Sequence, residues 1–273
     1  RIEEAKKNKV KAHVVDKPLF RYWNRWVDSG RYPMLFSFDL KTKEYKNLFK
    51  GTGYTFDVKG AGAGNYDISP DGKEICFVFD TARNPGLDSN NDLYTLDLAS
   101  GKIANITEAN KAGDSSPKYS PNGKYILYSS TKTPFTPEYS RLTLFDRDAG
   151  SSKVLTEEFE YSPSGAQWCK DTEHIYFTAG VEGRSPMFRY DLEKAKIQKL
   201  FDGHSMASVQ VGVNEKRLFF SRQAFHMPPT LFAANKDGSD EIQLTKFNDK
   251  LLSEIRRHNA ESIKFKGAEE MKF

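Results

Sequence analysis

The stretch that decides the fold reads Tyr66-Asp67-Ile68-Ser69-Pro70-Asp71-Gly72-Lys73, and it recurs along the chain. A second copy reads Lys118-Tyr119-Ser120-Pro121-Asn122-Gly123-Lys124, and two degraded copies read Gln167-Trp168-Cys169-Lys170-Asp171 and Gln210-Val211-Gly212-Val213-Asn214-Glu215-Lys216. Equivalent positions lie 51 residues (120 minus 69), 49 residues (168 minus 119) and 43 residues (211 minus 168) apart. A fixed period of this length indicates a repeat architecture.

Each copy has the same anatomy: a short strand, a Pro-Asp-Gly type turn, and then an apolar run rich in β-branched and aromatic residues. The second strands are expected at 75–79, 125–128, 174–177 and 217–220. Third strands follow at 34–40, 93–98, 142–146, 187–192 and 231–234, and fourth strands at 45–49, 103–107, 153–156, 197–201 and 242–245. Four antiparallel strands per unit of this length are typical of a β-propeller blade.

A helical repeat is excluded because no segment between residues 50 and 247 keeps a 3.6-residue apolar period over 12 positions. The sequence predicts an all-β propeller of four complete blades and one partial blade, which is an incomplete ring. We expect residues 31–246 to form the blades, residues 1–30 to be a connector from a missing upstream blade, and residues 247–273 to be a linker. Open blade faces expose apolar surface, so we also expect self-association.

Composition narrows the class of protein further. The chain has 273 residues, of which 38% are hydrophobic, and a formal net charge of +4. This charge is too small and too scattered to predict nucleic-acid binding, and no apolar run is long enough to predict a membrane span. Cys76 and Cys169 stand alone, without the spacing of a zinc site or a disulfide framework. Arg1 stands in place of a starting Met, so we expect a piece of a longer protein.

Two segments flanking the repeats carry a resemblance to a known family. The opening contains Lys9-Val10-Lys11-Ala12-His13-Val14-Val15-Asp16 and Phe20-Arg21-Tyr22-Trp23-Asn24-Arg25-Trp26, and the exit reads Leu244-Thr245-Lys246-Phe247-Asn248-Asp249. With the repeats between them, they resemble the propeller of prolyl oligopeptidase family serine peptidases, in the dipeptidyl-peptidase and acylaminoacyl-peptidase branch. Asn24 and Arg25 depart from the acidic residues common at those positions.

The resemblance implies a propeller that restricts access to a serine peptidase active site, so that short peptides enter and folded proteins do not. Residues 261–267 look like the first strand of the C-terminal α/β-hydrolase domain that follows in this family, and the rest of that catalytic domain is absent from the chain. The resemblance favours a periplasmic or secreted compartment, with a cytoplasmic one as the alternative. The second functional class is a non-catalytic, protein-binding propeller of the Tol type, since Ser-Pro-Asp-Gly turns occur there too.

No catalytic machinery is expected within the chain. A hydrolase nucleophile needs a GxSxG turn, and the nearest match, Gly203-His204-Ser205-Met206-Ala207, has Ala at the last position and falls between two blades. The glycine run at 60–64 leads into a strand rather than the helix of a dinucleotide site. The five histidines have no metal-ligand spacing, and Asn105-Ile106-Thr107 is an incidental glycosylation sequon. We predict no cofactor and no metal.

Loops that interrupt the blade period with charged and aromatic residues are the candidates for substrate contact. They are residues 83–91, with Asp88 and Asn91; residues 157–161, with Glu157, Glu158, Glu160 and Tyr161; and residues 225–229, with Phe225 and His226; Arg184 is a further candidate. An exopeptidase must hold the terminal ammonium of its substrate, and a partly desolvated carboxylate is the natural partner. The competing interpretation of these charges is a solvated turn.

Overall fold

The computed structural model describes residue 7 and residues 21–22, 24–26, 32–56, 62–81, 90–134, 138–212, 216–263 and 265. It divides into two compact units, residues 1–162 and residues 163–273. Most of the predicted connector and most of the loop at 83–91 lie outside the described residues, as do residues 264 and 266–273. Residues 261–263 are described outside any strand.

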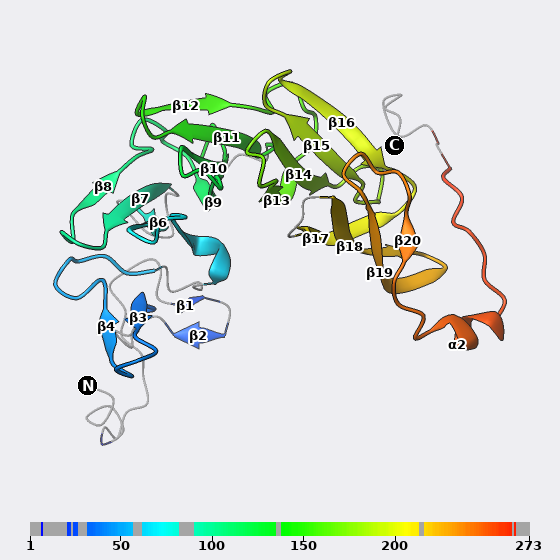
Figure 1. Cartoon of the computed structure of the whole chain (residues 1–273), viewed down its shortest axis with the longest axis horizontal. Helices are drawn as coiled ribbons and strands as arrows, with labels where there is room; N and C mark the ends of the chain where they lie inside the picture. The colour runs from blue at the N-terminus through cyan, green and yellow to red at the C-terminus, as the bar shows by residue number, and fades with distance from the viewer. Residues whose placement is uncertain are drawn as a thin grey trace. The chain divides into compact units, whose positions relative to one another are not determined.

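The first unit contains two four-stranded antiparallel sheets (Figure 1). One sheet consists of β5 (Tyr66–Ile68), β6 (Glu74–Asp80), β7 (Asn91–Asp97) and β8 (Ile103–Asn105). The next consists of β9 (Asp114–Tyr119), β10 (Tyr125–Ser130), β11 (Arg141–Asp146) and β12 (Ser151–Val154). Two short hairpins precede them, β1 (Arg21–Tyr22) with β2 (Arg25–Trp26), and β3 (Phe36–Phe38) with β4 (Tyr45–Asn47). A single 3-10 turn, η1 (Ala63–Asn65), leads into β5.

The second unit repeats the same plan twice. Its sheets are β13 (Pro163–Trp168), β14 (His174–Ala179), β15 (Met187–Asp191) and β16 (Lys196–Phe201), followed by β17 (Ser205–Val211), β18 (Arg217–Ala224), β19 (Met227–Asn235) and β20 (Ile242–Gln243). A five-residue helix, α2 (Asp249–Ser253), follows. The predicted all-β fold of four complete four-stranded blades and one partial blade, β3–β4, is confirmed. Each sheet is open, with its first and last strands as edges.

The repeated turn is held by its own polar side chains. Ser69 Oγ donates to Asp71 Oδ1 at 2.7 Å and accepts from the Glu74 amide at 2.9 Å. Ser120 and Asn122 repeat both bonds in the next blade, at 2.7 and 2.9 Å. The glycine of each turn has a positive φ, +70° at Gly72 and +71° at Gly123, which side chains rarely adopt. The Ser-Pro-Asp-Gly pattern therefore fixes the link between first and second strands.

A second repeated feature follows the fourth strands of three of the four complete blades, β8, β12 and β20. Thr107 Oγ1 accepts a hydrogen bond of 2.9 Å from the Leu93 amide, and Thr156 Oγ1 accepts one of 2.9 Å from the Leu142 amide. Thr245 Oγ1 does the same for Leu231 at 3.0 Å. A side-chain oxygen thus takes the place of a backbone partner, so the fourth strands stop before the threonine that the sequence assigned to them. Since Thr107 is buried, its sequon has a structural use.

Blades pack face to face through strand residues that alternate in direction. Ile75 and Phe77 of β6 pack with Phe49 of the partial blade. Cys76 and Val78, which point the other way, pack with β10. In the second unit one core joins β14 to β18, with Tyr176 and Phe220 nearly fully buried. Burial of both faces explains why the second strands are almost continuously apolar.

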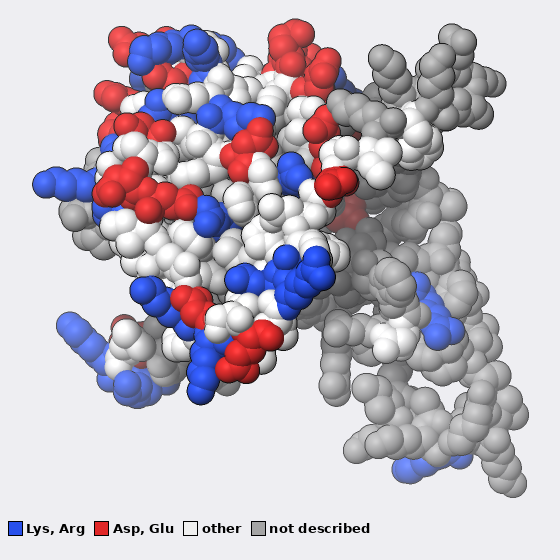
Figure 2. All heavy atoms as spheres, turned by 90° about the vertical axis from the view of Figure 1, so that its right-hand side faces the viewer, with Lys and Arg blue, Asp and Glu red and all other residues white. Residues whose placement is uncertain are grey.

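Charged side chains of both signs lie on the face of the molecule that Figure 2 shows. On the face shown in Figure 2, basic and acidic side chains of the described residues are interspersed. No helix among the described residues is long and apolar enough to span a membrane.

Candidate functional site

The sequence candidates that the structure describes belong to the same end of their own blades. In a four-stranded meander, the loop from second to third strand and the exit from the fourth strand lie at one end of the sheet. Asn91 follows the β6–β7 loop, Arg184 lies in the β14–β15 loop, and Phe225 and His226 form the tip of the β18–β19 hairpin. Residues 157–161, which we call the acidic loop, follow β12. Asp88 lies outside the described residues.

The acidic loop divides its carboxylates into one paired and two available groups. The loop begins after the buried Thr156, and a turn closes from the Phe159 amide to the Thr156 carbonyl at 3.2 Å. Glu157 forms an ion pair with Lys132 of the β10–β11 loop. Glu158 and Glu160 are exposed, and neither forms an ion pair with a described basic residue. Two carboxylates are therefore free to meet a cationic ligand.

Aromatic rings lie beside these carboxylates. The rings of Phe159 and Tyr161 meet edge to face with centroids 5.5 Å apart, and Tyr139 lies 6.5 Å from Tyr161. The Arg141 guanidinium lies 5.6 Å from the centre of the Tyr139 ring, which is half exposed. Rings of this kind give apolar contact and also attract cations through their faces. The arrangement suits an amine that carries an apolar side chain.

The β10–β11 loop is the part of this site that sequence reasoning missed. Glu138 accepts hydrogen bonds from the Lys132 amide at 2.9 Å and the Thr133 amide at 2.7 Å. These bonds, with one from the Thr133 hydroxyl, lower the pKa of Glu138 below its usual value. A signal was present in the sequence: ten residues, 131–140, separate two strands that a two- to five-residue turn would have joined.

The remaining candidates have fewer side-chain contacts in the structure than the acidic loop has. Asn91 is the half-buried first residue of β7 and pairs with Asp80 of β6. Arg184 is exposed and closes a tight turn through paired backbone bonds with Val181. Phe225 is 86% exposed at the hairpin tip, and the carbonyl of His226 accepts a hydrogen bond of 3.2 Å from Arg257. Phe225 and His226 thus lie beside the segment that leaves the last blade.

The predicted absence of a hydrolase nucleophile bears on Ser205. That residue opens β17 and pairs with Gln223 of β18, so it lies in a strand. The strained turn into a helix that exposes a nucleophilic serine is not formed there.

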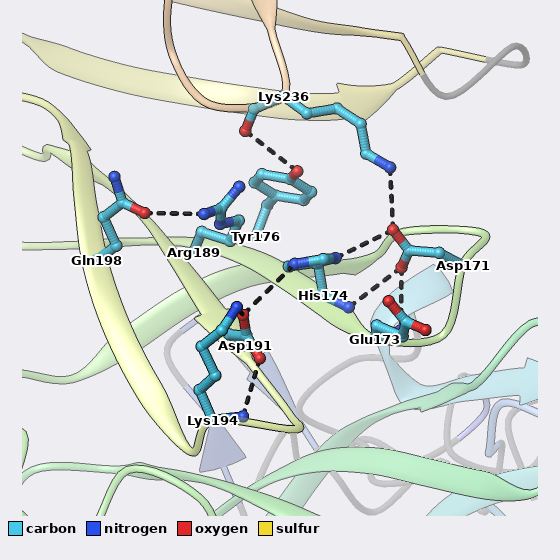
Figure 3. Close-up of polar contacts among 9 residues, drawn as sticks. All are labelled: Asp171, Glu173, His174, Tyr176, Arg189, Asp191, Lys194, Gln198 and Lys236. Carbon is cyan, nitrogen blue, oxygen red and sulfur yellow. Dashed lines mark hydrogen bonds and ion pairs between the residues drawn. The ribbon is translucent and has the colours of Figure 1, made fainter.

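A second polar cluster occupies the opposite end of the blades, in the second unit (Figure 3). Asp171, Glu173 and His174 bring three potential metal ligands within 4.8 Å of one another. However, Asp171 Oδ2 already accepts from Lys236 Nζ at 2.9 Å and contacts His174 Nδ1 at 3.0 Å. Burial acts to raise the pKa of Asp171, but the hydrogen bonds to the carboxylate, chiefly those from Lys236 and the Glu173 amide, together outweigh burial and hold that pKa well below its usual value. An ammonium group bound to the Asp171 carboxylate disfavours a metal ion there.

This cluster joins two blades. Lys236 lies in the β19–β20 turn, and Asp171 lies in the β13–β14 turn of the preceding blade. The first unit has an equivalent link, in which Arg147 of the β11–β12 turn donates to Glu74 at 2.9 Å. Tyr119 reinforces that link with a hydrogen bond of 2.6 Å to the same carboxylate. The two clusters therefore read as structural clamps between neighbouring blades.

Blades of this kind, stacked through such clamps and carrying their variable loops at one end, define a β-propeller domain. No protein-family model matches the chain. It is similar to the dipeptidyl-peptidase 5 of Porphyromonas gingivalis, with 26% identity over 254 residues, which are 91% of this chain and 37% of that protein. The dipeptidyl-peptidase 5 of Porphyromonas endodontalis is 28% identical over 255 residues, 91% of this chain and 36% of that protein. The chain thus spans little more than a third of these relatives.

Solved structures agree on the fold. The acylaminoacyl peptidase of Pyrococcus horikoshii matches 87% of this chain and 34% of its own, with a TM-score of 0.65 and 16% identity. The β-propeller domain of the trilobed protease from Pyrococcus furiosus matches 78% of this chain and 58% of its own, with a TM-score of 0.58 and 18% identity. TolB from Acinetobacter baumannii matches 79% and 49%, with a TM-score of 0.57 and 18% identity. The resemblance to the propeller of prolyl oligopeptidase-type peptidases is confirmed.

Proposed function

We propose that this chain is the propeller part of a serine exopeptidase that releases dipeptides or N-terminal residues from short peptides. The observation that carries the proposal is the similarity to dipeptidyl-peptidase 5 over 91% of the chain. The chain itself has no hydrolytic role in this proposal. The catalytic serine belongs to an α/β-hydrolase domain of the parent protein.

The contribution of the propeller is selection by size. Blade loops at one end of the sheets surround the route to the catalytic domain, so that short peptides pass and folded proteins do not. The Tol-type binding propeller is the alternative function, and TolB is among the solved structures that share this fold. That match shows a shared fold, whereas the sequence relatives with the greater identity are named as peptidases.

Within this function we assign the terminal ammonium of the peptide to the acidic loop. Glu158 and Glu160 are the exposed carboxylates of the loop, and Phe159 and Tyr161 present rings beside them. A charge-assisted hydrogen bond to an ammonium is stronger than a neutral one, and an adjacent ring reduces the competing water. Asp88, Asn91, Arg184, Phe225 and His226 stay candidates for contact with the rest of the peptide.

The first experiment asks whether the parent is a peptidase. Reading the coding sequence beyond residue 273 should reveal a GxSxG motif followed by Asp and His within about 250 residues, the size of a hydrolase domain. A fluorophosphonate probe should label the parent on one serine and leave this chain unlabelled. A parent without that motif would favour the binding propeller.

The second experiment asks whether the acidic loop holds the ammonium. In the full-length enzyme, Glu158→Gln with Glu160→Gln should raise KM for free-amine dipeptide substrates about tenfold, which corresponds to about 1.4 kcal/mol. KM for N-acetylated substrates should not change. Glu108→Gln is the matched control, because Glu108 is an exposed acid that follows β8 at the same end of its blade. Unchanged KM in the double variant would remove the acidic loop from the substrate site.

A further inference from the structure

Asp114 is a fully buried carboxyl group with an incomplete set of partners. It is the first residue of β9, and its side chain is 0% exposed. Its Oδ1 accepts a hydrogen bond of 2.9 Å from Asn110 Nδ2, while its Oδ2 has no hydrogen-bond partner among the described residues. Asp92, the other buried carboxylate at this end of the first unit, acts on Asp114 by repulsion. A buried charge with these surroundings is costly.

Asn110 connects this carboxyl to the next loop along the blade. Its side-chain amide also donates to the Thr131 carbonyl at 3.0 Å. Beside it, the Thr131 amide donates to the Gly113 carbonyl at 2.9 Å, and the Gly113 amide donates to Thr131 Oγ1 at 3.0 Å. These bonds tie the segment between β8 and β9 to the first residue of the β10–β11 loop.

The connection continues to the acidic loop. Thr131 is followed by Lys132, which pairs with Glu157, and by Thr133, whose amide is bound by Glu138. Two side chains therefore hold the start of the β10–β11 loop. Asn110 binds the Thr131 carbonyl, and Glu138 accepts hydrogen bonds from the Lys132 and Thr133 amides. With the bonds at Thr131 broken, the Lys132 backbone keeps its hydrogen bond to Glu138 alone, so the anchor of the acidic loop is weakened.

We propose that Asn110 and Asp114 form a protonation-dependent latch that fixes residues 131–133 at the start of the β10–β11 segment and, through the Lys132–Glu157 ion pair, the acidic loop. The latch closes when Asp114 is neutral. When Asp114 is ionised, its unpartnered oxygen needs water, and water reaches it by opening of the segment at 110–113. The consequence for substrate binding rests on the proposed function of the acidic loop, whereas the latch itself does not.

The raised pKa of Asp114 supports a latch that is closed when this carboxyl is neutral. Burial raises the pKa of Asp114 to about 7, against the lowering effect of the Asn110 hydrogen bond and of the nearby Thr107 side chain, and repulsion from Asp92 adds to the increase. The other titratable groups near Asp114 do not lower its pKa back to the ordinary value. The pKa of Asp92 is itself raised by burial, and the pKa of Tyr128 is raised to about 12, chiefly by burial and partly by Asp114.

The sign follows from linkage. The pKa of Asp114 in the folded chain lies above the ordinary value of 3.8, so the folded state binds the proton more tightly. The stability that this proton contributes is fully present below about pH 4 and is lost as the pH rises through about 7. The latch should therefore be closed in mildly acidic solution and open above neutrality.

Hydrogen exchange of this chain tests the latch without any substrate. Amide protection at residues 131–133 and 156–161, corrected for intrinsic exchange rates, should fall about tenfold between pH 6 and pH 8 in the wild type, as the neutral fraction of Asp114 falls. Asp114→Asn, which keeps the shape without the charge, should remove this pH dependence. Asn110→Ala should lower protection at both pH values. Asp97→Asn is the control, since Asp97 binds Ser100 in the turn at the other end of the blade and should keep the wild-type response.

Two results would overturn the proposal. One is a wild-type pH response that persists in Asp114→Asn, because the proton would then belong to another group. The other is unchanged protection in Asn110→Ala, because the loop would then be held by other bonds. If exchange behaves as expected while Glu158→Gln with Glu160→Gln leaves KM unchanged, the latch stands and the substrate role of the acidic loop falls.

Discussion

Lys236 Nζ lies 2.9 Å from Asp171 Oδ2 and so joins the last described blade to the one before it. The lysine side chain is 28% exposed and the aspartate 19%. Tyr176 adds a hydrogen bond of 3.2 Å from its hydroxyl to the Lys236 carbonyl, which fixes the turn that carries the lysine. The clamp is partly shielded from water, so it should contribute more to stability than an exposed ion pair does.

We predict that Lys236→Met destabilises the second unit by about 1–3 kcal/mol, because the Asp171 carboxylate loses a charged partner in a partly buried place. Lys194→Met is the control: Lys194 also pairs with an aspartate, but its side chain is 68% exposed, and its loss should cost less than about 1 kcal/mol. Chemical denaturation at pH 7 measures both. Equal costs for the two lysines would contradict the role of burial in the clamp.

The pH dependence of the same clamp has a definite sign. The pKa of Asp171 is lowered in the folded chain, so its contribution to stability is present above its ordinary value and is lost as the pH falls through the lower, folded value. The difference in unfolding free energy between wild type and Lys236→Met should therefore shrink below about pH 4. Denaturation curves at pH 7, 4 and 3 measure it. A difference that grows in acid would contradict the assignment.

The threonines that end the fourth strands give a graded prediction. Thr107→Val and Thr156→Val each leave a buried amide, at Leu93 and Leu142, without an acceptor, at a cost of about 1–3 kcal/mol. Thr245→Val should cost less than either, since Leu231 is 50% exposed and water can replace the lost oxygen. Urea denaturation of the three variants gives the order. If Thr245→Val proved as costly as Thr156→Val, exposure would not set the cost.

Much of the fold could be predicted from the sequence because its repeated signals are local. The Ser69-Pro70-Asp71-Gly72 turn has hydrogen bonds within five residues of itself, so the pattern alone specifies the structure. The bulges in the first strands could not be predicted this way. Ser116 has a φ of +57° where the register between β9 and β10 shifts, and Gly165 and Ser208 have +61° and +54° at equivalent shifts. A serine at such a position carries no signal, since tertiary packing imposes the conformation.

The candidate site could likewise be predicted from the sequence only in part. The acidic loop stood out in the sequence because three acids and two aromatics follow a strand. Its division into a paired Glu157 and exposed Glu158 and Glu160 depends on Lys132, which is 25 residues earlier. Asp114 was overlooked because its burial follows from contact with Asn110 and from its place at the start of β9, the first strand of its blade. Contacts between loops of one blade are long-range in sequence and leave no periodic signal.

The two cysteines should be inert in the folded chain. Cys76 and Cys169 are both 0% exposed, and burial raises the pKa of each thiol above its usual value. Reaction with a thiol reagent at pH 8 should be on the order of 100-fold slower than in denaturant, because local opening must come first. Absorbance of the released thiolate follows the reaction. A fast phase of one equivalent in native buffer would show that one of these thiols is accessible.

The open face of the last blade leads to the final prediction, self-association. Register places Phe219 opposite Ala233, and Ala233 opposite Ile242, so these residues share one face with Leu231. Phe219, Leu231 and Ile242 are 41%, 50% and 46% exposed, although the opposite face of the same sheet is packed into the core. A contiguous apolar stripe on a sheet face favours pairing with another copy of the chain.

Sedimentation velocity should show mass increasing with concentration in the wild type, and Phe219→Ser with Leu231→Thr should remain monomeric. Phe225→Ser is the control, because Phe225 is more exposed but lies at the hairpin tip. A wild type that stays monomeric at the highest concentration, or a Phe225→Ser variant that abolishes association, would refute this use of the blade face.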